Sequence, residues 1–159
     1  MIFQDLSPAD HAWVIALGNA HATETGPLDQ DHLTHLVEAS FVSWVIRPDL
    51  GFVITFAPDA AYESPNFRWF VARDKQFIYV DRIVIADHAK GQGLARKLYE
   101  ALFATAASQG YSAIVAEINA NPPNLASDQF HATLGFTPVG RADFLSGKSV
   151  TYVSRSLKD

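Results

Sequence analysis

The alternation of hydrophobic and polar positions divides the chain into helical and extended segments. Apolar residues recur every three or four positions in four segments, which we predict to form helices: residues 6–21, 29–40, 91–108 and 127–135. Runs rich in β-branched and aromatic residues predict strands at residues 41–46, 51–57, 76–86, 111–119, 136–144 and 149–157, with a short first strand at residues 2–4. Residues 67–74 fit either a short helix or a coil.

Capping and turn residues set the boundaries of these elements. Ser7, followed by a proline, is typical of a helix N-terminus, and Asp29 or Asp31 would cap the second helix. The tetrapeptide Arg-Pro-Asp-Leu at residues 47–50 predicts a tight turn between two antiparallel strands. Because the chain has no long linker and no repeat, we predict a single α/β (α+β) domain over residues 1–159, built on a central sheet.

The composition limits the classes of function. Hydrophobic residues make up 48% of the 159 positions and the formal net charge is −5, which argues against nucleic-acid binding but is compatible with an amine substrate. Cysteine is absent, and this excludes disulfides, thiolate zinc sites and a cysteine nucleophile. The chain lacks a window of about 18 unbroken apolar residues and a signal-peptide pattern at its start. We therefore expect a cytoplasmic protein that does not enter membranes.

A glycine-rich turn, KGQGLA at residues 90–95, lies where the longest predicted strand passes into the most regular predicted helix. Gly91 and Gly93 carry no Cβ atom that would keep a ligand away from the backbone. The first N–H groups of a helix lack intrahelical partners, and the helix dipole adds positive charge there, so the turn suits a phosphate. The alternative is a plain turn before a surface helix. Since Arg96 stands at the place of the third glycine, the turn is not a dinucleotide fingerprint.

Two motifs together carry a resemblance to a known family. The turn resembles the Q/R-x-x-G-x-G/A motif of the GNAT N-acetyltransferase superfamily, with Lys90 where arginine or glutamine is usual. Further on, NLASDQFHATLGF is similar to the superfamily motif N-x-x-A-x-x-F-Y-x-x-x-G-F. The residues that fit this second motif are Asn124, Ser127, Phe130, Leu134, Gly135 and Phe136. The resemblance spans residues 77–157 and implies a mostly antiparallel mixed sheet of six or seven strands, flanked by about four helices.

The resemblance also implies acetyl-CoA as the cofactor, with CoA as the product. In the superfamily, amides of the glycine turn hold the pyrophosphate, and the preceding strand opens away from its neighbour to pair with pantetheine. The cofactor-binding residues that we expect on this basis are Ile83, Val84, Ile85, Lys90, Gly91, Gln92, Gly93, Leu94, Ala95, Arg96, Asn119, Asn124, Ser127, Phe130 and His131.

Direct acetyl transfer to an amine needs a general base and an acid that protonates the leaving thiolate. His131 occupies the place where many members of the superfamily carry the acidic tyrosine, and it serves either as this acid or only as a packing residue. Tyr152 on the last predicted strand is a rival acid. The candidate bases are Asp81 and Glu117; the alternative is that such a carboxylate forms a structural salt bridge with Arg82 or another cation. Strand alternation places Asp81 on the same face as Ile83.

An aromatic group between the third strand and the long strand is our candidate for the acceptor site. Tyr62 and Trp69 are expected to contact the substrate, whereas Phe67 and Phe70 more simply cover the core. The histidines have no ligand partners at metal-binding spacing, so no metal site is expected. We expect a small-molecule or amino-acid-like or peptide-like amine as acceptor, and a homodimer through exposed strand edges.

Two other functions remain open at the level of the sequence. A non-catalytic acyl-CoA-binding module would explain the missing tyrosine, and it would bind acetyl-CoA without releasing a thiol. A nucleotide-phosphate binder would instead prefer nucleoside diphosphates over CoA.

Overall fold

The structure, a computed structural model, describes residues 3–22 and 26–158. Seven strands form one sheet in the order β1-β2-β3-β4-β5-β7-β6. The strands are β1 (Gln4–Asp5), β2 (Ser43–Ile46), β3 (Gly51–Phe56), β4 (Phe77–Ile85), β5 (Ala113–Asn121), β6 (Thr137–Asp143) and β7 (Ser149–Ser156). The α-helices of the described residues are α1 (His11–Ala20), α3 (Gln30–Ala39), α4 (Pro65–Val71), α5 (Leu94–Ser108) and α6 (Leu125–Thr133), and the 3₁₀ helices are η1 (Pro8–Asp10) and η2 (Asp87–Ala89). The expected α/β fold with a central mixed sheet is confirmed.

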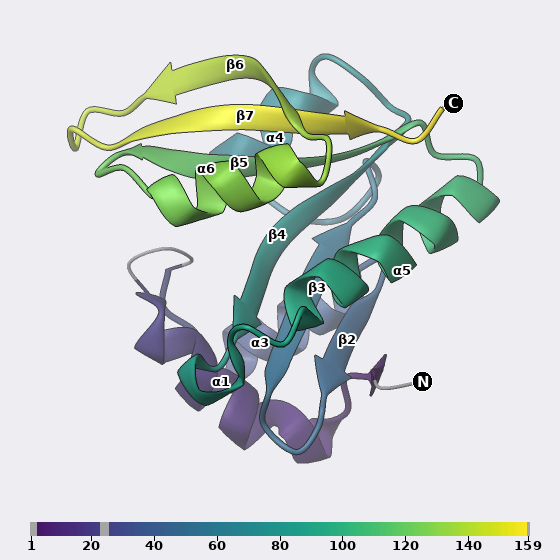
Figure 1. Ribbon diagram of the computed structural model, residues 1–159, viewed down its shortest axis with the longest axis vertical. Helices are drawn as coiled ribbons and strands as arrows, with labels where there is room; N and C mark the ends of the chain where they lie inside the picture. The colour runs from purple at the N-terminus through teal and green to yellow at the C-terminus, as the bar shows by residue number, and fades with distance from the viewer. Residues whose placement is uncertain (1–2, 23–25, 159) are drawn as a thin grey trace.

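Helices cover both faces of the sheet (Figure 1). On one face lie α5 and α6, and Leu98 of α5 packs into the same core as Ile78 of β4. On the other face lie α1, α3 and α4, which bury Leu33 and Phe67 in a second core with Phe52 of β3. The two cores make β3 and β4 the most enclosed strands, as expected for strands whose residues are apolar on both faces.

Several helix boundaries differ from the sequence prediction, among them the starts of α4, α5 and α6. The segment that fitted either helix or coil contains α4, which starts at Pro65 because proline is favoured in a first helical turn. α5 starts at Leu94 rather than at Gly91, because both glycines ahead of it have positive φ angles that a helix does not allow. α6 starts at Leu125, two residues earlier than expected. Part of the expected first strand, residue 2, lies outside the described residues. No helix of the described ranges is long and apolar enough to cross a membrane.

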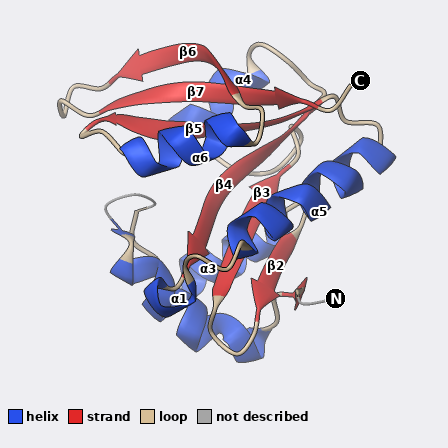
Figure 2. Cartoon of the chain, viewed as in Figure 1, coloured by secondary structure: helices blue, strands red, loops and turns tan. Residues whose placement is uncertain are grey.

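The sheet is antiparallel except where β4 and β5 run side by side. These two strands pair only from Phe77 to Tyr79 on β4, opposite Ala113 to Val115 on β5. Beyond this short ladder the strands diverge, and Figure 2 shows the gap that opens between them. The expectation that the strand before the glycine turn opens away from its neighbour is therefore confirmed.

A β-bulge interrupts β4 at Asp81. The pairing with β3 moves from Ile54 opposite Arg82 to Thr55 opposite Val80, so Asp81 is the extra residue. Ile83 consequently packs in the core of Ile78 and Val80, whereas the Asp81 carboxylate accepts a hydrogen bond from Tyr62, which packs in the opposite core. The prediction that Asp81 and Ile83 share a face was wrong, because simple alternation does not hold across a bulge.

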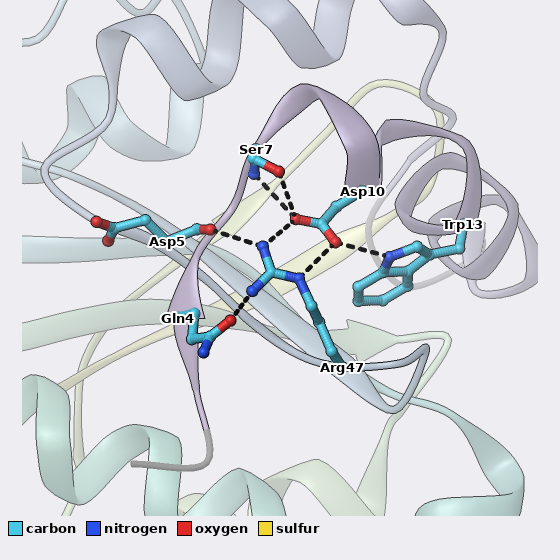
Figure 3. Close-up of polar contacts among 6 residues, drawn as sticks. All are labelled: Gln4, Asp5, Ser7, Asp10, Trp13 and Arg47. Carbon is cyan, nitrogen blue, oxygen red and sulfur yellow. Dashed lines mark hydrogen bonds and ion pairs between the residues drawn. The ribbon is translucent and has the colours of Figure 1, made fainter.

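An ion pair between the buried Asp10 and the exposed Arg47 joins the N-terminal elements to the sheet (Figure 3). The guanidinium of Arg47, in the turn after β2, donates to Asp10 of η1 from Nε at 3.0 Å and from Nη2 at 2.8 Å. Trp13 and the backbone N–H of Ser7 also donate to this carboxylate at 3.0 Å. Burial alone would raise the pKa of Asp10, but these hydrogen bonds outweigh it and lower the pKa to about 2. Gln4 accepts a further bond from Arg47.

Candidate active site

A cleft of about 570 Å³ occupies the gap between β4 and β5. One wall is the part of β4 that has lost β5 as a partner, and the other wall is β5. The N-terminus of α5 closes one end, and α6 lies along the side. Its lining residues include His21, Val80, Asp81, Arg82, Ile83, Val84, Ile85, Ala89, Lys90, Gly91, Gly93, Leu94, Ala95, Arg96, Tyr99, Ala116, Glu117, Ile118, Asn119, Asn124, Ala126, Ser127, Phe130 and His131.

The glycine turn presents backbone N–H groups to this cleft. Gly91 and Gly93 have φ angles of 85° and 73°, and a Cβ atom built on either would meet no atom within 4 Å. The first intrahelical bond of α5 runs from the Lys97 N–H to the Gly93 carbonyl at 3.1 Å. The N–H groups of residues 94–96 therefore precede the helical ladder and are available to an anion. The open space in front of both glycines fits a bound phosphate group.

Cations near the turn are partly engaged in surface ion pairs. Lys90 Nζ lies 3.0 Å from Asp87, and the side chains of Arg96 and Glu100 lie 3.9 Å apart. Such exposed pairs are weak and exchange readily with solvent or with a ligand. The backbone N–H groups are therefore the main anion donors of the turn, and the flanking cations add to them.

Glu117 of β5 is the most perturbed carboxyl group in the cleft. It accepts a hydrogen bond from the hydroxyl of Tyr79 on β4. Burial raises the pKa of Glu117 to about 8, the Tyr79 hydrogen bond lowers it, and the neighbouring charge of Asp81 raises it further. Burial raises the pKa of Tyr79 as well, so this hydroxyl keeps its proton. The carboxyl group can thus exchange a proton near neutral pH.

Asp81 is held by two partners. Its carboxylate accepts a hydrogen bond from Tyr62 and another from Arg82 Nε at 2.8 Å, and its side chain is 5% exposed. Both carboxylate oxygens are therefore engaged. This arrangement fits an ion pair that stabilises the bulge better than it fits a group that must receive a proton from an acceptor.

His131 of α6 is buried and its ring nitrogens both have partners. Nδ1 lies 2.8 Å from the Ser127 carbonyl oxygen, which only accepts, so Nδ1 carries the proton. Nε2 is then unprotonated and accepts from the Tyr99 hydroxyl at 2.7 Å. Burial lowers the pKa of His131, which favours this neutral ring.

The model of the acetyltransferase (GNAT) family matches residues 21–136. The chain is a GNAT acetyltransferase. The resemblance that the two motifs carry is thereby confirmed, and so is the prediction of an enzyme. No curated protein sequence matches the chain.

Solved structures of other acetyltransferases share the fold of this GNAT protein. Ard1 from Thermoplasma volcanium aligns with a TM-score of 0.77 and 13% identity over 99% of this chain and 97% of its own. The acetyltransferase yncA from Salmonella typhimurium, solved with its cofactor acetyl-CoA, aligns with a TM-score of 0.71 and 21% identity over 99% of this chain and 94% of its own. An aminoglycoside 6'-N-acetyltransferase complexed with coenzyme A aligns with a TM-score of 0.73 and 12% identity over 100% of this chain and 98% of its own.

The GNAT cleft brings together most of the residues that the sequence singled out. Every expected cofactor-binding residue lines it except Gln92, and both candidate bases and His131 line it too. Three other candidates are not among the lining residues. Tyr152 donates to Asn66 at 2.8 Å and stacks on Trp69, with ring centroids 4.2 Å apart. Tyr62 donates a hydrogen bond to Asp81, which lines the cleft.

Two residues that the sequence did not single out belong to this GNAT site. Tyr79 contacts Glu117, and Tyr99 contacts His131. A signal for Tyr99 was present, because a tyrosine on the apolar face of a helix needs a partner for its hydroxyl. For Tyr79 no such signal existed, since its role depends on the position of β5 beside β4. The ion pair with Arg82, which was the structural alternative for Asp81, is present.

Proposed function

We propose that this enzyme is an acetyl-CoA-dependent N-acetyltransferase that transfers the acetyl group directly to a primary amine of a small-molecule, amino-acid-like or peptide-like acceptor. Acetyl-CoA is the cofactor that the family resemblance implies. The observation that carries the proposal is the cleft itself, because a strand freed from its neighbour leads straight into a turn of open N–H groups. A donor with a long polar arm and a pyrophosphate requires these two features.

The residues of the cleft fit acetyl-CoA in two ways. The N–H groups at the start of α5 and the space in front of Gly91 and Gly93 would hold the pyrophosphate. The edge of β4 at residues 83–85 faces the gap, and its backbone groups would hydrogen-bond the amides of the pantetheine arm as a strand partner does. Asn119 and Asn124 lie at the opposite wall for further amide contacts.

When bound, acetyl-CoA supplies an acetyl group activated as a thioester. Glu117 would receive the proton of the acceptor amine, because its pKa of about 8 lies close to neutral pH while its carboxyl group faces the cleft. Tyr79 holds that carboxyl group in place. A backbone N–H of β4 would donate to the developing oxyanion, which requires no particular side chain at residues 83–85.

The proton for the leaving sulfur would come through the pair of His131 and Tyr99. At rest His131 holds its proton at Nδ1, and its Nε2 accepts from the Tyr99 hydroxyl. A second proton, taken up from solvent, would make His131 an imidazolium with a proton on Nε2. This proton would pass to the Tyr99 oxygen as the Tyr99 hydroxyl gives its own proton to the sulfur, and the lowered pKa of His131 favours that release. In this proposal His131 serves as the acid in place of the tyrosine of other superfamily members.

Calorimetry with acetyl-CoA, CoA and ADP, followed by a thiol-release assay on a panel of amines, tests this function. We expect micromolar binding of both CoA species, no comparable binding of ADP, and thiol release with at least one class of amine. Binding of acetyl-CoA without turnover of any amine would favour a non-catalytic acyl-CoA-binding module. A preference for ADP over CoA would refute the assignment of the cleft.

Two further expectations stay predictions. β6 forms one edge of the sheet, and Val139 on it is 48% exposed, so a homodimer through this edge is part of our proposal. Sedimentation analysis at several concentrations would test it. A cytoplasmic location would be tested by fractionation of the native host.

A further inference from the structure

The bulge in β4 gives Arg82 an unusual position. Successive side chains of a regular strand point to opposite faces, but Asp81 and Arg82 reach each other across the bulge, with Nε of Arg82 2.8 Å from the carboxylate. Both side chains are 5% exposed. A cation is thus built into the wall of the cleft, next to the unpaired section of β4.

The hydrogen bonds of Arg82 leave part of its guanidinium without a protein partner. Besides the bond to Asp81, Nη1 donates to the Gly26 carbonyl at the long distance of 3.4 Å. A guanidinium carries five N–H donors, so several remain. Within the described residues, no side-chain N or O that is shielded from solvent lacks a partner. Nη2 of Arg82, for which neither of these bonds accounts, therefore reaches solvent, and Arg82 is one of the residues that line the cleft.

Arg82 and the proposed base Glu117 line the same cleft, and Tyr79, three residues before Arg82 on β4, donates a hydrogen bond to Glu117. The charge of Arg82 lowers the pKa of Glu117, whereas that of Asp81 raises it, so all three groups interact electrostatically. Tyr62 feels the same three charges. An acceptor whose amine reaches Glu117 would therefore have its neighbouring atoms close to Arg82.

We propose that Arg82 binds a carboxylate of the acceptor, so that the preferred substrates carry a carboxylate a few bonds from the amine, as an amino acid does. The inference rests on the proposed function, because it takes Glu117 as the group that receives the amine proton. A guanidinium matches a carboxylate with two parallel hydrogen bonds, which a free amine without the carboxylate cannot make. A hydrogen bond to a charged group contributes enough to favour the acid over the plain amine by about 10- to 100-fold.

The test compares each amino acid with the amine that lacks its carboxylate: tyrosine with tyramine, methionine with 3-(methylthio)propylamine, and lysine with cadaverine. Thiol release gives kcat/KM for both members of a pair, and the ratio of the two is the readout. Because the ratio is independent of the amount of folded enzyme, a loss of stability in Arg82→Gln does not affect it. We expect about a 10- to 100-fold preference for the acid in the native enzyme in at least one pair, and a ratio near one in Arg82→Gln.

Two variants serve as controls. Arg82→Lys keeps the positive charge beside Asp81 but loses the paired donors, and it should retain only part of the preference. Arg141→Gln removes an exposed arginine of β6 that pairs with Asp143, and it should leave the ratio unchanged. Equal rates for both members of every pair in the native enzyme would overturn the proposal, and so would an unchanged preference in Arg82→Gln.

A binding measurement separates this proposal from the proposed reaction. Calorimetry of the same pairs, with and without CoA, reports recognition of the carboxylate whether or not thiol is released. Tighter binding of the acids, lost in Arg82→Gln, supports the carboxylate site even if turnover fails and the catalytic proposal with it. Binding of neither member, or equal binding of both, would mean that Arg82 only ties β4 to the segment at Gly26.

Discussion

The substitution Glu117→Gln tests the central group of the proposed reaction. Glutamine keeps the size of the side chain and still accepts the hydrogen bond from Tyr79, but it cannot ionise. The native carboxyl group has its pKa raised from 4.5 to about 8 in the folded protein, mainly by burial. The substitution therefore removes a single titration and little else, which makes both its effect on stability and its effect on rate interpretable.

The sign and the size of the stability effect follow from this pKa. A raised folded-state pKa means that the contribution of Glu117 to stability is fully present below pH 4.5 and is lost as the pH rises through about 8. Each pKa unit corresponds to about 1.4 kcal/mol, so the loss across this range is at most about 5 kcal/mol. Partial relaxation around the ionised group will reduce it, and we expect about 2–4 kcal/mol. The native protein should therefore lose stability relative to Glu117→Gln as the pH rises.

Urea unfolding near pH 5, 7 and 9 measures this difference. A gap of about 2 kcal/mol corresponds to a shift of roughly 1 M in the unfolding midpoint for a chain of this size. Glu100→Gln is the matched control, because Glu100 lies exposed on α5 and should give no pH-dependent gap. A constant gap between the native protein and Glu117→Gln from pH 5 to 9 would refute the raised pKa.

The rate supplies the second measurement of the same variant. The kcat/KM of the native enzyme should rise with pH to a plateau above about pH 8, and we call this rise the acidic limb. Glu117→Gln should lack the acidic limb and should react about 100-fold or more slowly. Asp81→Asn should keep the limb, since Asp81 is committed to Arg82 and Tyr62. If the limb persisted in Glu117→Gln and disappeared in Asp81→Asn, the base would be Asp81 and our assignment would be wrong.

Three further outcomes are expected. Gly93→Glu should abolish CoA binding in calorimetry. The control is Gly147→Glu, at an equally open glycine with φ of 91° that does not line the cleft, and it should leave CoA binding intact. Equal affinities of the two variants for CoA would refute the binding of phosphate at the glycine turn. His131→Phe should lower turnover and keep the affinity for acetyl-CoA. It should also reduce the free energy of unfolding by about 1–3 kcal/mol, because the Tyr99 hydroxyl loses its acceptor. An unchanged turnover rate would mean that another group is the acid. Between about pH 4 and pH 2 the native protein should lose roughly 2 kcal/mol of unfolding free energy relative to Asp10→Asn, as measured by urea unfolding. The reason is that the stability contributed by a lowered pKa is lost as the pH falls through that pKa. If the unfolding free energies of both proteins changed equally with pH, the ion pair with Arg47 would not be a source of stability.

The elements of the fold were predictable because their sequences agree with their environments. The four-residue period of Leu94, Leu98, Leu102 and Ala106 predicted a helix with one apolar face, and all four residues are buried against the sheet. β3 was predictable as a strand because Phe52, Val53, Ile54 and Phe56 are β-branched or aromatic, and these residues pack into the cores on both faces of the sheet. Such local signals do not depend on how the strands are arranged, so the sequence alone is enough to predict these elements.

The position of the candidate site was predictable from its backbone signal. The glycine turn before a helix predicts open N–H groups, and the structure places this turn at one end of the cleft, with positive φ angles at both glycines. The choice between Asp81 and Glu117 was not predictable, because it depends on which tyrosine and which cation each carboxylate contacts. Those contacts follow from the strand register, which a sequence does not specify for a parallel pair that lasts only three residues on each strand.

The bulge at Asp81 links the cleft, the base and the proposed specificity. A bulge bends its strand and increases its twist, and β4 loses its pairing with β5 at Tyr79, two residues before the bulge. The bulge brings Arg82 beside Asp81, and the divergence of β4 from β5 exposes the β4 edge to the cleft. Glu117 on β5 accepts from the hydroxyl of Tyr79 on β4. In a regular strand Asp81 and Arg82 would point to opposite faces. The bulge therefore places the cation that we propose for the acceptor beside the opening that we propose for the donor, in the same cleft as the proposed base.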